Sequence, residues 1–263
     1  EITNGYGART VFSKDVLLNE RKTSIDFGTE LYQDHYRWQT IENLYEDTNG
    51  QGSLEGELLS NNKEKRSQIN VFVSLKTSLS EKITVQIGVN TNKAMYDYED
   101  LFNEGNTNTS AERDFDIIVA PTLNTLYQLS KSNTIFLNIS RGFNYPGLEE
   151  TLTPDGVINP DIGPETGWNY EVGSSLSFLS NSLNIKASAY LLSINDLVVA
   201  ERIGDDQFIG RNAGKTHHRG IEMGLNYTQS LSRSLSLSAF FNTEVNFHKF
   251  IDFVDGDEDF SGN

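Results

Sequence analysis

The chain has 263 residues, no cysteine and a formal net charge of −16 at pH 7. Disulfides and thiol chemistry are therefore excluded, and the excess of 37 acidic over 21 basic residues argues against a nucleic-acid-binding protein, which needs a basic surface. Hydrophobic residues make up only 37% of the chain, and no run of about 18 apolar residues predicts a transmembrane helix. The 15 Phe, 11 Tyr and 2 Trp argue against a disordered chain. These totals favour a fold of strands in which only every second residue is apolar.

Alternating apolar and polar residues, the period of a β-strand, run through most of the chain. They predict about ten strands, at residues 5–13, 23–45, 66–79, 82–97, 112–129, 132–142, 168–179, 183–202, 209–229 and 234–252. The alternation is clearest at 183–191, and Asn195 with Asp196 interrupts the apolar face further along, where we expect the lipid to end. Pro121 cannot donate a ladder hydrogen bond, so either a bulge interrupts the segment 112–129 or that strand is shorter.

The connections between these strands alternate in length. Short polar turns occupy 79–82, 129–133, 179–182 and 230–234, and longer segments lie at about 46–65, 98–111, 143–167 and 203–208. Outer-membrane β-barrels have tight turns at one rim and long loops at the other, whereas a soluble β-sandwich has no reason to sort its loops by length. We therefore predict an all-β fold, an antiparallel transmembrane β-barrel wall of about ten strands in contact with outer-membrane lipid. A soluble sandwich is the alternative.

The longest connection contains most of the prolines. Pro146, Pro154, Pro160 and Pro164 all fall within residues 143–167. Proline fixes φ and lowers the conformational entropy that a loop loses when it becomes ordered. We therefore expect this segment to be structured over the mouth of the barrel.

Ten strands could close into a small barrel, but two features favour a piece of a larger one. The chain ends in the polar stretch "DGDEDFSGN", and many inward positions carry small side chains, such as Ser74, Gly88, Ser140 and Gly173. A small barrel must fill its interior with side chains, whereas a wide barrel leaves room for water or a plug. We expect residues 1–263 to form one partial barrel domain without a plug and without the last strands.

Three segments carry a family resemblance: "ISRGFNYPGLEE" (139–150), "NPDIGPETGWNYEVG" (159–173) and "NAGKTHHRGIEMGLNY" (212–227). In this order they resemble TonB-dependent outer-membrane receptors, chiefly over residues 130–263. The residues that carry the match are Arg141, Gly142, Phe143, Pro146, Asn159, Pro160, Pro164, Glu165, Glu171, Gly173, Asn212, Gly214, Gly220 and Glu222. The segments "ERIGDDQFIGRNAGK" and "DFSGN" look most like iron-complex receptors of the Bacteroidetes.

The resemblance implies a barrel of 22 strands in the bacterial outer membrane, with its long loops extracellular. It also implies an N-terminal plug, which this chain lacks, and an inner-membrane TonB complex that drives import through that missing part. The expected cargo is a ferric siderophore or another iron complex, which would be a ligand, since no cofactor is expected. The alternatives are a family member with another cargo (cobalamin, copper, peptide or glycan), or less favoured, a ten-stranded outer-membrane enzyme or a passive porin.

No catalytic or metal-binding motif is present, so we expect no enzyme and no metal site. Strand parity places Glu171 and Glu222 toward the lumen, where they either pair with arginines of a plug or of neighbouring strands or are simply solvated. Arg141 has outward parity and is expected to reach headgroups or a loop above the hydrocarbon. His217 and His218 are adjacent on a strand and face opposite sides, so they cannot bind one ion together.

Overall fold

The computed structural model describes residues 2–44, 49–102, 109–151, 153, 158–204, 207–212, 214–255 and 258–262. It contains one large antiparallel sheet in which ten strands follow one another in the order β1-β2-β3-β4-β6-β7-β8-β9-β12-β13. These strands are β1 (Ile2–Leu18), β2 (Arg21–Asn43), β3 (Glu55–Ser78), β4 (Ile83–Asp100), β6 (Ile118–Ser130), β7 (Asn133–Asn144), β8 (Glu165–Phe178), β9 (Leu183–Asn195), β12 (Lys215–Ser230) and β13 (Ser236–Asp252).

Smaller elements lie at one end of this sheet. Strand β5 (Ala111–Asp114) pairs with β4, while β10 (Val198–Gly204) with β11 (Gln207–Asn212) and β14 (Val254–Asp255) with β15 (Glu258–Asp259) form separate hairpins. The short helix α1 (Leu148–Thr151) precedes β8. None of the described residues forms a helix that is long and apolar enough to span a membrane.

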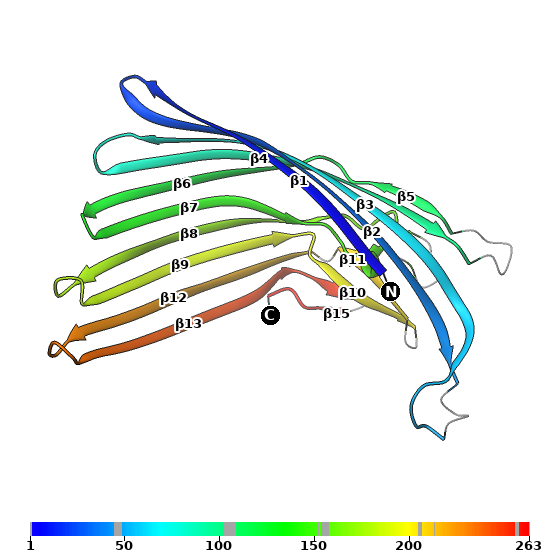
Figure 1. Cartoon of the computed structure of the whole chain (residues 1–263). Helices are drawn as coiled ribbons and strands as arrows, with labels where there is room; N and C mark the ends of the chain where they lie inside the picture. Colours follow the sequence, from blue (N-terminus) through cyan, green and yellow to red (C-terminus); the bar gives the residue numbers. More distant parts are fainter. Residues whose placement is uncertain are drawn as a thin grey trace.

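The sheet bends as a curved wall with its connections sorted by length (Figure 1). The tight turns, such as 131–132 and 179–182, lie together at the left end in the view. At the opposite end lie α1, β5 and the β10–β11 hairpin, which we call the mouth end. The predicted alternation of short and long connections is therefore confirmed.

The two faces of the wall differ in polarity. On the outward face the apolar side chains are exposed, for example Ile87 at 56%, Val172 at 51% and Ile221 at 60%. The inner face carries hydrogen-bonded amides, where Asn138 Nδ2 donates to Asn124 Oδ1 at 2.6 Å and Asn169 Nδ2 donates to Asn138 Oδ1 at 3.3 Å. A soluble sandwich would cover the apolar face with a second sheet, but the other sheets of the described residues are two hairpins. This polarity fits a wall that faces lipid on one side.

Aromatic rings lie over glycines on the inner face and fix the register of neighbouring strands. A Cβ on Gly173 would meet Phe136 Cζ at 2.4 Å, and a Cβ on Gly28 would meet Phe72 Cζ at 2.4 Å. In both pairs the ring belongs to the strand that is paired directly opposite the glycine. The glycine thus leaves the space into which a large ring packs.

The hydrophobic core lies at the mouth end instead of in the wall. All buried hydrophobic side chains among the described residues belong to β4, to the 115–120 segment or to the loop before β8: Ala94, Tyr96, Tyr98, Phe115, Ile118, Ala120 and Ile162. Membrane crossing needs only about 9–11 residues of strand. Strands as long as β2 with 23 residues and β3 with 24 therefore extend well beyond the lipid and form a second, water-facing structure.

Three predicted strands are wrong as continuous elements. The segment 112–129 is divided into β5 and β6, the segment 183–202 into β9 and β10, and the segment 209–229 into β11 and β12. Strand β9 ends at Asn195, because Asp196 adopts a left-handed conformation with φ of 58°, and Gly214 with φ of 49° makes the corresponding bend before β12. The predicted interruption at Asn195 and Asp196 thus marks the end of the regular strand.

Two further boundaries also differ from the prediction. Strand β3 begins at Glu55, eleven residues before the predicted start at 66. The early start was not predicted because the first half of this strand lacks clear alternation of apolar and polar residues. Pro121 lies within β6 opposite Val89 of β4, while the ladder between β6 and β7 stops at Thr122. The missing N–H of Pro121 therefore coincides with the end of one ladder and not with a bulge.

Candidate functional site

The candidate site is the mouth segment, by which we mean the described residues 145–151, 153 and 158–164 between β7 and β8. This segment folds back over the inner face of the wall. It is bound to β4 and β5 of the large sheet on one side and to β11 on the other, so it connects the wall to the separate β10–β11 hairpin. The predicted ordered loop over the mouth has this form in its described residues.

An aromatic cluster anchors the start of the mouth segment. Tyr96 of β4 donates its hydroxyl to the carbonyl of Pro146 at 3.2 Å, and the Tyr145 hydroxyl donates to the carbonyl of Asn92 at 3.4 Å. Phe115 stands between the two tyrosines, with ring centroids 5.1 Å from each. Pro146, one of the motif residues, is among the most completely buried side chains. It is therefore a packing residue whose carbonyl also accepts a hydrogen bond.

The far end of the mouth segment is held by the side chains of Arg113 and Asn159, which donate hydrogen bonds to main-chain carbonyls. Arg113 Nη2 donates to the carbonyl of Ile162 at 2.8 Å. Asn159 is 6% exposed, donates from Nδ2 to the carbonyl of Gly210 at 2.9 Å and accepts from the amide of Asp161 at 3.0 Å. Pro160 follows in the turn. The motif asparagine thus replaces the hydrogen bonds that a regular strand would supply.

Asn212 forms the second main-chain bridge, which we call the Asn212 latch. Its Oδ1 accepts from the amide of Gly163 at 2.6 Å, and its Nδ2 donates to the carbonyl of Gly163 at 3.0 Å and to that of Asp196 at 2.6 Å. One amide side chain therefore forms hydrogen bonds with both the N–H and the C=O of Gly163, as the main chain of a neighbouring strand would do. Pro164 follows directly, and its missing N–H ends further pairing there.

Glu165 connects the start of β8 to the neighbouring hairpin. Its Oε1 accepts from the amide of Val198 at 2.7 Å, and its Oε2 accepts from Asn144 Nδ2 at 3.3 Å. Val198 is the first residue of β10, where the long strand has already been broken at Asp196. The carboxylate therefore satisfies a main-chain donor that the break would leave without a ladder partner.

Arg141 and its neighbours complete this set of motif residues at the end of β7. Arg141 Nη1 donates to the carbonyl of Val119 at 3.1 Å, next to Pro121, where the β6–β7 ladder has ended. It thus reaches a neighbouring strand, whereas headgroups or a loop were predicted. Phe143 packs against Tyr145 with centroids 5.5 Å apart, and a Cβ on Gly142 would meet nothing within 4 Å.

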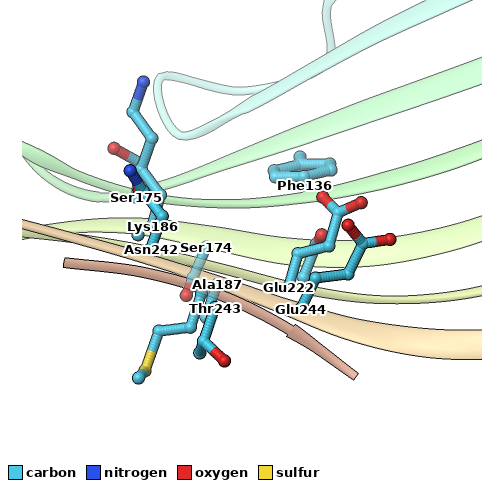
Figure 2. Close-up of a pocket in the computed structure, with 12 residues that line it drawn as sticks. Phe136, Ser174, Ser175, Lys186, Ala187, Glu222, Asn242, Thr243 and Glu244 are labelled. Carbon is cyan, nitrogen blue, oxygen red and sulfur yellow. The ribbon is translucent and has the colours of Figure 1, made fainter. Parts of the chain in front are cut away.

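The remaining motif residues lie in the wall, away from the mouth segment. Glu222 is paired directly opposite Glu244, and Figure 2 shows both carboxylates on one side of the sheet with Phe136, while Thr243 lies on the other. Glu171 shares inner-face parity through its pairing with Asn138. Within the described part of the chain, neither Glu171 nor Glu222 makes an ion pair. Gly220 leaves space for the Tyr190 hydroxyl, and a Cβ on Gly214 would overlap the carbonyl of Asp252.

A buried charged group beside the mouth segment was missed by the sequence analysis. Glu64 of β3 is 1% exposed and accepts from Arg66 Nε at 2.8 Å, while the Arg66 guanidinium lies 4.8 Å from the centre of the Tyr96 ring. Both residues lie beyond the outward apolar band that ends at Ile69, and therefore outside the lipid. Burial raises the pKa of Glu64, against the opposing effect of Arg66, and burial raises the pKa of Tyr96 to about 12. Residues 61–66 are all polar, so the sequence carried no signal for this burial.

The side chains at the mouth are suited to stacking and hydrogen bonding. No three His, Cys, Asp or Glu side chains come together as a metal-binding group in the described residues. The groups that face the lumen are instead rings, amides and charged side chains held in fixed positions. Tyr36, Trp38 and Tyr98 continue the aromatic surface along β2 and β4, with centroid separations of 5.2 and 5.9 Å. Such a surface can bind a solute by stacking and hydrogen bonding.

The fold and its mouth define the wall of an outer-membrane β-barrel with elaborated loops at one rim. The family model described as "TonB dependent receptor-like, beta-barrel" matches residues 3–263. The chain therefore belongs to the TonB-dependent receptor family. Receptors of this family are outer-membrane proteins, so the mouth end is extracellular and the tight turns are periplasmic. The predicted family, fold class and location are confirmed.

Solved structures agree with this assignment. The ferric citrate transporter FecA in its unliganded form has a TM-score of 0.73 at 15% identity, over 95% of this chain and 36% of that chain. The alcaligin outer-membrane receptor FauA from Bordetella pertussis has a TM-score of 0.65 at 13% identity, over 99% of this chain and 40% of that chain. The copper transporter OprC has a TM-score of 0.63 at 15% identity, over 93% and 38%. This chain thus spans 40% or less of the length of these structures.

Proposed function

We propose that this chain is part of a receptor that imports a scarce nutrient, energised by the TonB system, and that the cargo is a ferric siderophore or another iron complex. The observation that carries the proposal is the mouth segment, which is tied by single side chains across the inner face. A passive porin needs no such bridge between distant strands. An importer that captures a dilute solute does, because a binding surface assembled from loops must be held in place.

The wall supports the view that the whole receptor is larger than this chain. Strands β1 and β13 each have one neighbour in the sheet, so the described wall is open on both sides. The inner face carries glycine, serine and asparagine over much of its height, which leaves a wide lumen. We propose a barrel of 22 strands with a separate N-terminal plug, of which residues 1–263 form one contiguous part of the wall. The TonB complex would act through that plug.

The iron cargo is supported by the solved structures that share this fold, because most of those named here are receptors or transporters for iron complexes. FecA is a ferric citrate transporter, FauA an alcaligin receptor and Fiu a ferric-catecholate import receptor, whereas OprC is a copper transporter. We do not propose an enzyme, because receptors of the TonB-dependent family are transporters. Family members with copper, cobalamin, peptide or glycan as cargo remain the competing function.

The test is uptake by cells that lack the whole gene. Cells starved of iron are given radioactive iron as citrate, hydroxamate and catecholate complexes, one at a time, with and without a functional TonB protein. We expect loss of the gene to abolish the uptake of at least one complex, and loss of TonB to have the same effect. Normal uptake of every iron complex would contradict the iron proposal, and a defect confined to copper, cobalamin, peptide or glycan would establish the competing cargo.

A pair of variants connects the uptake to the mouth. Asn212→Ala removes the latch on Gly163, and we expect it to weaken cargo binding at least tenfold, because the binding loops would no longer be held. Asn4→Ala is the matched control, since Asn4 is an exposed amide on β1. Equal uptake by the two variants would show that the latch is not needed for import.

A further inference from the structure

Two histidines that are distant in sequence face each other on the inner face near the mouth end. His218 of β12 is paired directly opposite His248 of β13, and their Nδ1 atoms are 2.6 Å apart. The ring centroids are 4.9 Å apart, with the ring planes at 61°. The sequence drew attention only to His217 and His218, which face opposite sides, whereas the partner of His218 lies thirty residues later in the chain.

The level of this pair relative to the lipid follows from the outward face of the same strands. Ile221 is paired with Val245, and both are exposed outward. The next outward-facing residue of β12 toward the mouth is Arg219, whose guanidinium lies 6.0 Å from the Phe247 ring. The one after it is His217, which is paired opposite Lys249. Basic side chains at this height belong to the headgroup level. The His218–His248 pair therefore faces the lumen above the hydrocarbon, in reach of water and solutes.

The hydrogen bonds around the pair leave both Nδ1 atoms directed at one point. The second ring nitrogen of His218, Nε2, is 2.9 Å from Oγ1 of Thr216, and Thr216 is only 3% exposed. At 2.6 Å only one proton can lie between the two Nδ1 atoms, so one imidazole donates and the other accepts. A metal-binding histidine is typically oriented in this way, by a hydrogen bond from the ring nitrogen that does not bind the metal.

We propose that His218 and His248 form a two-nitrogen site for a divalent transition-metal ion, with Cu²⁺ bound most tightly, followed by Ni²⁺ and Zn²⁺. Both Nδ1 lone pairs become ligands when the donor ring changes tautomer: its Nδ1 releases the shared proton to solvent and its Nε2 takes one up, so both imidazoles stay neutral. A metal–nitrogen distance of about 2.0–2.1 Å requires the two nitrogens to separate to about 3 Å, which small side-chain rotations supply. Imidazole ligands suit these ions, and the order follows the general ranking of divalent metals.

The rest of the coordination sphere would be water. Among the described residues no third His, Cys, Asp or Glu completes a group with this pair. Glu222 and Glu244 are four residues from His218 and His248 along the same face, so they lie about 13 Å away and contribute charge without ligation. Asn246 and Tyr190, which are hydrogen-bonded to each other at 2.5 Å, occupy the level between. The site is thus open to the lumen, and a bound ion would bridge β12 to β13.

The test uses Cu²⁺ on the full-length receptor, purified in detergent and stripped of metal with a chelator. Copper titrations are followed by calorimetry and by the electron paramagnetic resonance spectrum, for wild type, His218→Ala, His248→Ala and the control His217→Ala. His217 is a neighbouring histidine on the opposite face, so its loss reports any effect that is not specific to the pair. Retention of the folded electrophoretic mobility in all four proteins shows that the barrel is intact.

We expect one Cu²⁺ equivalent with nitrogen hyperfine splitting in wild type and in His217→Ala, and at least a tenfold weaker affinity in His218→Ala and in His248→Ala. Binding should also weaken on acidification, because protons compete for the same lone pairs. Unchanged Cu²⁺ affinity in either pair variant, or an equal loss in His217→Ala, would overturn the proposal. These results are independent of iron uptake, so the cargo proposal and the copper site succeed or fail separately.

Discussion

The wall and the mouth of this molecule are specified in different ways. In the wall, each strand of the large sheet pairs with its neighbour in sequence, apart from short intervening hairpins, and the outward apolar face needs only the correct parity. In the mouth, the decisive contacts join residues 49 to 51 positions apart, such as Gly163 with Asn212 and Asn159 with Gly210. The wall therefore depends on a repeated pattern, and the mouth on a few side chains that satisfy main-chain groups far away. Five predictions separate the two regions.

The largest expected effect is at the buried charge beside the mouth. Arg66→Met leaves the Glu64 carboxylate buried without its partner, and we expect a loss of about 3–5 kcal/mol in the free energy of unfolding. Lys65→Met is the matched control, because Lys65 is exposed on the outward face. Urea unfolding in lipid vesicles measures both. The double variant Arg66→Met, Glu64→Gln should recover much of the lost free energy of unfolding, because it removes the buried charge. If it does not, an uncompensated charge is not the cause of the loss.

A smaller effect is expected within the wall, at a glycine covered by a ring. Gly173→Ala places a Cβ at 2.4 Å from Phe136 Cζ and 2.9 Å from the carbonyl of Ala187, so we expect a cost of about 1–3 kcal/mol from overpacking. Gly142→Ala is the control, because a Cβ there meets nothing within 4 Å. Trimming the ring with Phe136→Leu in the Gly173→Ala background should reduce the cost. Equal destabilisation by the two glycine variants would contradict this account of Gly173.

The mouth should also respond to alkaline pH through its buried tyrosine Tyr96. The pKa of Tyr96 is raised by burial from 10.0 to about 12 in the folded protein. Because the folded state holds the proton more tightly, this stabilisation is complete below pH 10 and is lost as the pH rises through about 12. Phenolate absorbance of wild type minus Tyr96→Phe reports the titration. A Tyr96 that titrates near pH 10 would show that the aromatic cluster is open to water.

The exposed ion pair between Lys63 and Glu99 should matter little. Its atoms are 2.9 Å apart, but both side chains are about half exposed, at 49% and 51%. We expect Lys63→Ala to change the free energy of unfolding by less than about 1 kcal/mol, since water screens such pairs. The same unfolding experiment checks it. A loss as large as that of Arg66→Met would mean that burial is not what distinguishes the two pairs.

The sequence allowed the wall to be predicted, because its strands repeat with a period of two and its turns are sorted by length. It also allowed most of the motif residues to be found, but not their roles. Nothing in the sequence indicates that Asn212 pairs with Gly163, or that Arg141 reaches Val119. The first contact depends on how the chain bends at Asp196, and the second on where the β6–β7 ladder ends. His248 was missed because its partner His218 lies on the neighbouring strand β12. The partner of Glu64, Arg66, is only two residues away on β3, but the burial of this pair could not be read from the sequence.

The central claim, that the Asn212 latch holds the mouth segment to the β10–β11 hairpin, is tested most directly by hydrogen exchange of the Gly163 amide in the full-length receptor in lipid. That amide donates to Asn212 Oδ1 at 2.6 Å. In Asn212→Ala we expect its exchange to become at least tenfold faster, a change of about 1.4 kcal/mol in local opening, while the amides of Val172 and Ala189 in the wall keep their protection. Unchanged protection of Gly163, or an equal loss across the wall, would contradict the account.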